Sequence, residues 1–281
     1  MDLRLIGIVC SLVLAGCAAP AAPSPAGDRP GVEDAATDEL AVDASDGLNE
    51  SELDAVVART MARIEMIRGL EFRETVPVEV VSRGQYLNGS SRDTTVDTAA
   101  ERAREQRYEA TMLVGENRTV GGAFAEIYGG SVLGYYSSAA DRIVIVSGNG
   151  TPTVDRTTLA HELMHALQDQ RLSLLGGAAG PDEAMAHTGV VEGDASYVEA
   201  RYEERCGEQW DCIDRPATSS ASSITDRNLG LYLTVYAPYS EGPTLVHRVK
   251  QRGGWDAVND LYTRPPKSSE QLIHPRDYPR D

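Results

Sequence analysis

This chain of 281 residues has few basic side chains and almost no lysine. Of its 26 cationic residues only Lys250 and Lys267 are lysines, whereas 43 residues are acidic, so the formal net charge is −17. Because phosphate backbones are bound by lysine and arginine, this balance argues against a nucleic-acid partner. An acidic, lysine-poor surface suits life in high salt, where counterions screen the repulsion between like charges. The alternative explanation is a high-GC bacterial genome that encodes an acidic linker.

The apolar run at the N-terminus, residues 5–15, is too short to span a membrane. It follows Arg4 and ends in the sequence LAGC at 14–17, which is the layout of a secretory signal with a lipobox. In a lipobox the cysteine is lipidated and becomes the mature N-terminus. We therefore expect residues 1–17 to be a lipoprotein signal peptide and Cys17 to carry the lipid. The mature chain would then be exported and held by this anchor on the outer face of the cell membrane.

Cysteine is also scarce, and only two cysteines lie beyond this signal. Cys206 and Cys212 are six residues apart, and in an exported chain such a pair is expected to form a disulfide that closes a small loop. Metal binding by the pair is the alternative, but no second pair of Cys or His lies near it. Residues 18–48 are rich in Ala, Pro and Asp, which predicts a disordered tether ahead of a folded domain at 49–281.

The pattern of the remaining chain predicts an α+β fold. Apolar residues at a helical period predict a helix over 53–67, with Ser51 and Asp54 in a capping-box arrangement and Gly69 at the end. A polar stretch at 97–112 is expected to be helical. The predicted strands are residues 76–83, 132–138 and 141–148, the last two joined as a hairpin. Strands early and helices late indicate a small mixed β-sheet followed by a helical C-terminal half.

The segment TTLAHELMHALQDQ, residues 157–170, has two histidines four residues apart around a glutamate. On a helix His161 and His165 lie on one face, one turn apart, and can bind one metal ion. Glu162 is offset from His161 by about 100°, so it lies beside the metal face, where it can act as a general base. This is the physical basis of the H-E-x-x-H motif, in which zinc lowers the pKa of a water molecule. The alternative is an ordinary amphipathic helix.

A catalytic zinc usually has three protein ligands and an open coordination position. The downstream candidates for the third ligand are Glu183, His187, Glu192 and Asp194. Glu192 is favoured because two valines precede it and would seat its helix on the core, while Gly193 would let the two metal-bearing helices approach closely. Asp194 is expected to accept a hydrogen bond from the far ring nitrogen of a ligand histidine. The alternative for Glu192 is an exposed glutamate.

A zinc peptidase also needs a hydrogen-bond donor beside the metal, to stabilise the oxygen anion that develops during hydrolysis. His274, in the proline-fixed segment RPPKSSEQLIHP, is the first candidate, and Glu270 would orient a partner there. Tyr236 and Tyr239 are the next candidates. The alternatives are a terminal surface loop for the histidine and packed aromatic rings for the tyrosines. His247 lies within a predicted helix and is expected to be structural.

The string HELMH at 161–165 followed by EGDA at 192–195 resembles the gluzincin metallopeptidases, whose third zinc ligand is a glutamate on the next helix. The wider set HELMHALQDQ, VVEGDA, YSEGP, GGWDAVNDLY and PPKSSEQLIHP is similar to a group of HExxH surface proteins and lipoproteins, chiefly from haloarchaea, over residues 53–274. The resemblance implies a zincin-like fold with one catalytic Zn²⁺. The chain departs from thermolysin-type gluzincins, which carry E-x-x-x-D, because the position four residues after Glu192 is Ser196.

The predicted function is zinc-dependent hydrolysis of peptide bonds outside the cytoplasm, with a protein or peptide as substrate and Glu162 as the catalytic base. The expected source is a halophilic archaeon, or otherwise a high-GC bacterium. The competing hypothesis is a non-hydrolytic zinc-binding surface lipoprotein that binds a partner. Such a module would have no chemical use for Glu162, which favours the enzyme. A third hypothesis, metal-dependent hydrolysis of a non-peptide amide, differs only in the shape of the cleft.

Overall fold

The computed structural model describes residues 32–37, 42–44, 46–90, 98–148, 153–215 and 228–279. The expected signal peptide and Cys17 lie outside these residues. The elements in chain order are α1 (Val32–Thr37), α2 (Glu50–Arg68), β1 (Val78–Ser82), α3 (Arg83–Ser90), α4 (Ala99–Ala110), α5 (Val120–Ser131), β2 (Gly134–Ser137), β3 (Arg142–Ser147), α6 (Arg156–Leu172), α7 (Pro181–Glu208), α8 (Leu229–Asp260) and α9 (Ser269–Ile273). The fold is α+β, as predicted, with a three-stranded sheet among helices. Along the described chain no helix has the length and apolar character needed to cross a bilayer.

The first long helix, α2, begins at a capping box and ends at a glycine. The Asn49 side chain accepts a hydrogen bond from the Glu52 backbone N–H, and the Glu52 carboxylate accepts one from the Asn49 N–H. The expected pairing of Ser51 with Asp54 is therefore wrong, because the helix starts earlier and both residues lie inside it. Gly69 ends the helix in the left-handed conformation, with φ of 72°, as predicted.

The expected tether at 18–48 contains the short helix α1, which packs against α2. Ala36 of α1 is fully buried, and its carbonyl accepts a hydrogen bond of 2.9 Å from Arg63 Nε. Leu48 is also buried in the core around α2. The contacts of the folded domain therefore begin before residue 49, at the part of the tether that is described.

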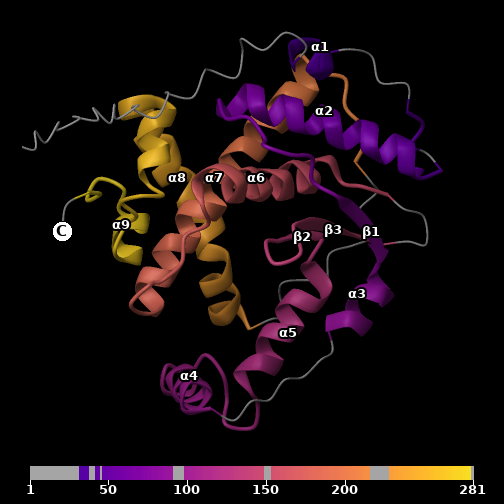
Figure 1. Ribbon diagram of the computed structural model, residues 1–281. Coiled ribbons are helices and arrows are strands. Elements are labelled where there is room, and N and C mark those ends of the chain that lie inside the picture. Colours follow the sequence, from indigo (N-terminus) through magenta and orange to yellow (C-terminus); the bar gives the residue numbers. More distant parts are fainter. Residues whose placement is uncertain are drawn as a thin grey trace, which may run out of the picture.

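The three predicted strands are confirmed, and they form one mixed sheet in the order β1-β3-β2. The central strand β3 pairs in parallel with β1 and antiparallel with β2, which confirms the hairpin (Figure 1). Its run Ile143–Val146 is buried, as a strand covered on both faces requires. Pro77 precedes the edge strand β1, and its carbonyl accepts a hydrogen bond from the Ile143 N–H.

Helix α6, which contains the HELMH motif, lies between α2 and the sheet (Figure 1). It begins at Asp155, whose side chain accepts hydrogen bonds from the backbone N–H groups of Thr157 and Thr158. Leu163 and Leu167 are fully buried in the core cluster that also holds residues of α2 and of the sheet. Burial of such a side chain contributes about 1.5–3 kcal/mol. The helix is thus fixed on two sides, and this sets the direction in which its histidines point.

Helices α7 and α8 touch at their backbones. A Cβ atom on Gly193 would lie 2.4 Å from the carbonyl carbon of Gly242, and one on Gly242 would lie 2.2 Å from the oxygen of Gly189. The expectation that Gly193 brings α7 close to α6 is therefore wrong, since its close neighbour is α8. The backbone of helix α8 departs from helical geometry only at Gly253–Gly254.

Candidate metal centre

The three predicted metal ligands come together between α6 and α7. His161 and His165 stand one turn apart on α6, and their Nε2 atoms lie 3.2 and 3.3 Å from Oε2 of Glu192 on α7. One ligand atom from each of the three residues falls within 4.8 Å of the others. In a tetrahedral site with metal–ligand bonds of about 2.0–2.1 Å, ligand atoms are about 3.3 Å apart. The donor types and the closeness of their ligand atoms therefore suit a metal ion.

The far nitrogen of each histidine meets an oxygen acceptor. His161 Nδ1 lies 3.0 Å from Oε2 of Glu199, and His165 Nδ1 lies 2.9 Å from Oε1 of Gln168. When Nδ1 donates to such an oxygen, the neutral imidazole keeps its lone pair on Nε2, which is the atom that faces Glu192. Both rings are thus oriented for metal binding through Nε2.

The predicted role of Asp194 is wrong, because it contacts neither histidine ring. Its carboxylate is fully buried and accepts hydrogen bonds from Arg68 of α2, at 3.0–3.1 Å, and from the hydroxyl of Tyr262, at 2.9 Å. The oxygen atoms that contact the Nδ1 atoms of the two histidines are those of Glu199 and Gln168. Asp194, two residues beyond Glu192, instead connects α7 to α2 and to Tyr262, which follows α8.

Glu162, the predicted base, is buried beside the two histidines. Its Oε2 accepts a hydrogen bond of 2.8 Å from the backbone N–H of Tyr136 in the edge strand β2. Burial raises the pKa of Glu162 above its ordinary value, and the nearby histidines oppose this shift. A raised pKa suits a carboxylate that accepts a proton near neutral pH. The strand holds this side chain next to the pocket described below.

The charges of the centre depend on one another. Burial lowers the pKa of His161, but hydrogen bonds to Glu192 and Glu199 outweigh burial and raise it to about 10. The Glu192 carboxylate likewise raises the pKa of His165 against the effect of burial. Burial also acts on Glu192, yet its hydrogen bonds from the two histidines hold its pKa well below its usual range. The carboxylates therefore favour positive charge between the three side chains, which a metal cation would supply.

A pocket of about 360 Å³ opens beside the metal centre. His161, Glu162 and Glu199 line it, and so do Tyr236 and Tyr239 of α8. The Tyr239 ring lies 6.2 Å from the His161 ring, nearly parallel to it. Burial and the carboxylates of Glu192 and Glu162 raise the pKa of Tyr239, so its phenol keeps its proton. The two tyrosine candidates thus lie at the pocket, with Tyr239 beside the ligands.

His274, the first candidate for the oxyanion donor, is elsewhere. It follows α9, its side chain is 58% exposed, and its ring lies 3.4 Å from Glu270. With His247 it lines a separate pocket that contains none of the three metal-ligand candidates. The prediction for His274 is therefore wrong, because α9 packs on α7 and α8 away from the HELMH motif. His247, expected to be structural, is exposed on α8 and contacts Gln251.

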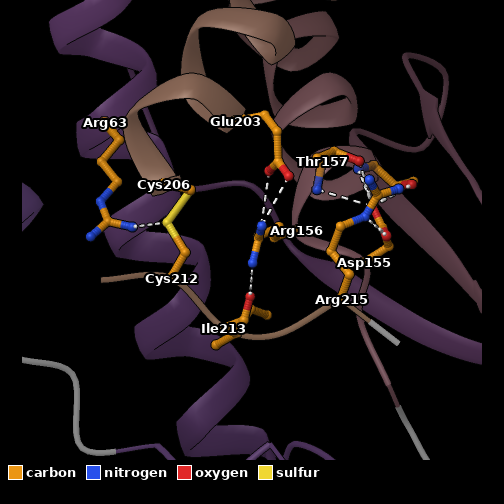
Figure 2. Close-up of polar contacts among 10 residues, drawn as sticks. Arg63, Asp155, Arg156, Thr157, Glu203, Cys206, Cys212, Ile213 and Arg215 are labelled. Carbon is orange, nitrogen blue, oxygen red and sulfur yellow. Dashed lines mark hydrogen bonds and ion pairs between the residues drawn. A yellow bond between two sulfur atoms is a disulfide. The ribbon is translucent and has the colours of Figure 1, made fainter. Parts of the chain in front are cut away.

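The predicted disulfide between Cys206 and Cys212 is present at the end of α7 (Figure 2). Arg63 of α2 donates to the Cys212 sulfur at 3.2 Å and to the carbonyl of Asp211 at 2.8 Å. The same guanidinium lies 4.8 Å from the ring of Trp210. This small loop is therefore held against α2 by several contacts of one buried arginine.

The segment after the disulfide ties the first turn of α6 to the end of α7 (Figure 2). Arg156 donates to both carboxylate oxygens of Glu203 at 2.9 Å and to the carbonyl of Ile213 at 2.8 Å. Arg215 donates to the Asp155 carboxylate at 3.0 Å. Because Glu203 lies on the same helix as Glu192, these bonds fix the two metal-bearing helices relative to each other.

Two further residues of the centre carry a signal in the sequence. Glu199 follows Glu192 by seven residues, which is two helical turns, so both lie on one face of α7. Gln168 follows His165 by three residues on α6, within reach of its ring. The partners of Asp194 carry no such local signal, since Arg68 is 126 residues away.

No protein-family model, curated protein or solved structure matches this chain. The resemblance to gluzincins and to haloarchaeal surface proteins therefore stays a prediction. What is established is the arrangement of the described side chains: a His161–His165–Glu192 group that can hold a metal ion, next to a buried glutamate and an open pocket.

Proposed function

We propose that this protein is a zinc-dependent peptidase that hydrolyses peptide bonds. The observation that carries the proposal is the convergence of His161, His165 and Glu192, with Glu162 buried beside them. Three protein ligands leave one position of a tetrahedral zinc open, which is typical of catalytic rather than structural sites. We include in this proposal the zincin-like fold that the sequence resemblance implies.

The residues of the site have separate roles in the proposed reaction. Zinc, when bound, would supply Lewis acidity: it would polarise the scissile carbonyl and make water acidic enough to lose a proton near neutral pH. Glu162 accepts that proton, and its raised pKa lets it hold the proton until the leaving amine takes it up. The backbone N–H of Tyr136 keeps the Glu162 side chain in place during the transfer.

We assign Tyr239 as the hydrogen-bond donor to the carbonyl oxygen of the scissile peptide bond. Its phenol stays protonated because burial and the neighbouring carboxylates raise its pKa. The ring lies beside His161 and lines the pocket, so the hydroxyl can donate to an oxygen that becomes negative during attack. Tyr236 lines the same pocket and is the second choice.

The experiment that tests the proposal compares the wild type with Glu162→Gln on a library of quenched fluorescent peptides in high salt. The wild type should contain about one zinc per chain by mass spectrometry of metals, and a chelator should abolish hydrolysis until zinc is added back. Glu162→Gln should still bind zinc but cleave at least about 100-fold more slowly. His274→Ala is the matched control, since its ring lies outside the pocket, and it should retain full activity.

Two results would overturn the proposal. Absence of stoichiometric zinc would remove the metal from the mechanism, and equal hydrolysis by wild type and Glu162→Gln would remove the base. Zinc binding without cleavage of any peptide would instead support the non-hydrolytic binding protein.

We also propose that the chain is exported and lipid-anchored through Cys17. The disulfide supports this placement, because such bonds persist mainly in oxidising compartments outside the cytosol. Mass spectrometry of the N-terminal peptide from the native source should find a lipid on Cys17. An unmodified cysteine in an intact N-terminus would contradict it.

A further inference from the structure

Three tyrosines of α8 form a row of stacked rings that leads to the metal centre. Tyr232, Tyr236 and Tyr239 are spaced by four and then three residues, so they share one face of the helix. Their ring centroids lie 5.7 Å apart for the first pair and 6.5 Å apart for the second, with the planes within 19° of parallel. The His161 ring continues the row at 6.2 Å from Tyr239. The tyrosine row therefore ends at a metal-ligand candidate.

The tyrosine row faces the pocket and is partly open to solvent. Tyr236 and Tyr239 are 47% and 40% exposed. Tyr128 of α5 and Leu133, which line the same pocket, are 44% and 49% exposed. The start of α8 packs beside α5 through the buried Leu231 (Figure 1). Large apolar side chains gathered around one pocket on an acidic protein indicate a ligand that covers them.

Few charged groups line this pocket. Among the described residues that line it, the ionisable ones other than tyrosine are His161, Glu162 and Glu199. All three belong to the metal centre, and the remaining lining is aromatic, aliphatic, glycine or hydroxyl-bearing. A charged group lying along the tyrosine row would lose water without gaining a partner. The lining of the row therefore favours an uncharged ligand segment.

We propose that the tyrosine row binds an extended segment of the peptide substrate that has aromatic or aliphatic side chains at alternate positions. Alternate side chains on one face of an extended strand are about 6.6 Å apart. This repeat matches the steps of 5.7–6.5 Å along the row, so each apolar side chain falls on the boundary between neighbouring rings. The peptide would then reach His161 with its scissile bond at the metal centre. The identity of the ligand as a substrate rests on the proposed function.

The test measures binding without cleavage, in the full zinc-loaded chain carrying Glu162→Gln. Two fluorescein-labelled heptapeptides of one composition serve as probes: Ser-Phe-Ser-Phe-Ser-Phe-Ser, with alternating phenylalanines, and Phe-Phe-Phe-Ser-Ser-Ser-Ser, in which they are contiguous. The alternating peptide should bind about tenfold more tightly by fluorescence anisotropy. Adding Tyr236→Ala should weaken it about tenfold, since one aromatic contact is lost, whereas Tyr236→Phe should retain the affinity. Leu233→Ala is the control, because this residue is exposed on α8 but does not line the pocket.

Each result decides the inference. Equal affinity for the two peptides, or no effect of Tyr236→Ala in a protein with unchanged circular dichroism, would overturn it. A competition experiment gives a further test. If an N-acetylglucosamine hexamer displaces the alternating peptide at a lower concentration than the unlabelled peptide does, the inference is overturned and the tyrosine row is a carbohydrate-binding surface. Because the measurement needs no hydrolysis, a wild type that binds the alternating peptide selectively but never cleaves it would refute the proposed function and leave the peptide preference standing.

Discussion

Replacing Asp194 with alanine is expected to destabilise the protein more than replacing its partner Arg68 with methionine. Both side chains have no exposed surface. Arg68 makes three close contacts with the Asp194 carboxylate and one hydrogen bond to Asn259. Its charge also lies 4.3 Å from the ring of Trp255. No described residue accepts a hydrogen bond from Nη1 of Arg68. Asp194 is therefore the main group that offsets the cost of burying the Arg68 charge.

The magnitude follows from which charge is left behind. Asp194→Ala leaves a guanidinium buried without a counter-charge, and because arginine does not lose its proton, the cost is about 3–5 kcal/mol. Arg68→Met leaves a carboxylate that still accepts a hydrogen bond from Tyr262, so we expect a loss of about 2 kcal/mol from the hydrogen bonds to the arginine. In the double variant neither charge is left, and the loss should be smaller than for Asp194→Ala alone.

Urea unfolding followed by far-ultraviolet circular dichroism measures these free energies. The chelated, metal-free protein is the right sample, because bound zinc would add its own stabilisation. A loss of 3–5 kcal/mol corresponds to a melting temperature lower by about 6–20 °C for a domain of this size. The reasoning is refuted if Arg68→Met is the more damaging single change, or if the double variant loses the sum of both.

Three other predictions concern the metal centre. The pKa of His161 is raised from 6.5 to about 10 in the metal-free protein. The ionised ring therefore stabilises the fold fully below pH 6.5, and this contribution is lost as the pH rises toward 10. Urea unfolding at pH 6, 8 and 10 should show the free energy of unfolding decline, and a flat profile would contradict the prediction. Zinc must displace the same proton, so calorimetry in buffers of different ionisation enthalpy should detect proton release on binding. Glu199→Ala should weaken zinc binding about 10–100-fold by competition with a chromogenic chelator, whereas Glu204→Gln, an exposed residue on the same helix, should not change it.

The elements that the sequence predicts correctly are those encoded by local spacing. A helical period predicts α2 and the helix of the HELMH motif, and β-branched runs predict all three strands. The two histidines share a helix face whatever the rest of the chain does. Glu192 could also be predicted, because it is the candidate preceded by apolar residues on the next helix. These conclusions need only neighbours within a few residues.

The sequence-based predictions are wrong where contacts between residues far apart in the chain determine the position of a side chain. Asp194 was expected to serve a histidine, but Arg68 from another helix takes its carboxylate, and nothing near either residue indicates the pairing. His274 lies in a short polar segment whose position is set by the packing of α9 on α7 and α8. Gly193 lies at a close helix approach, but its neighbour is α8 and not the expected α6, which the sequence around it does not indicate. Helix α5, with four glycines, shows no clear local preference.

The central position of α2 has a consequence for how the chain acquires its structure. Arg63 bonds to the Asp211 carbonyl 148 residues later, and Arg68 reaches residues 126 and 191 positions later. Closing a loop of such length costs about 4 kcal/mol of chain entropy, and this cost is offset only when α7 and α8 pack. A ribosome produces α2 early, yet the buried residues of α6 and α7 that share its core are made only later in the chain, up to Trp210. Stable packing of α2 is therefore expected only after α7 has been made, and folding should be slower than in helical proteins with local contacts.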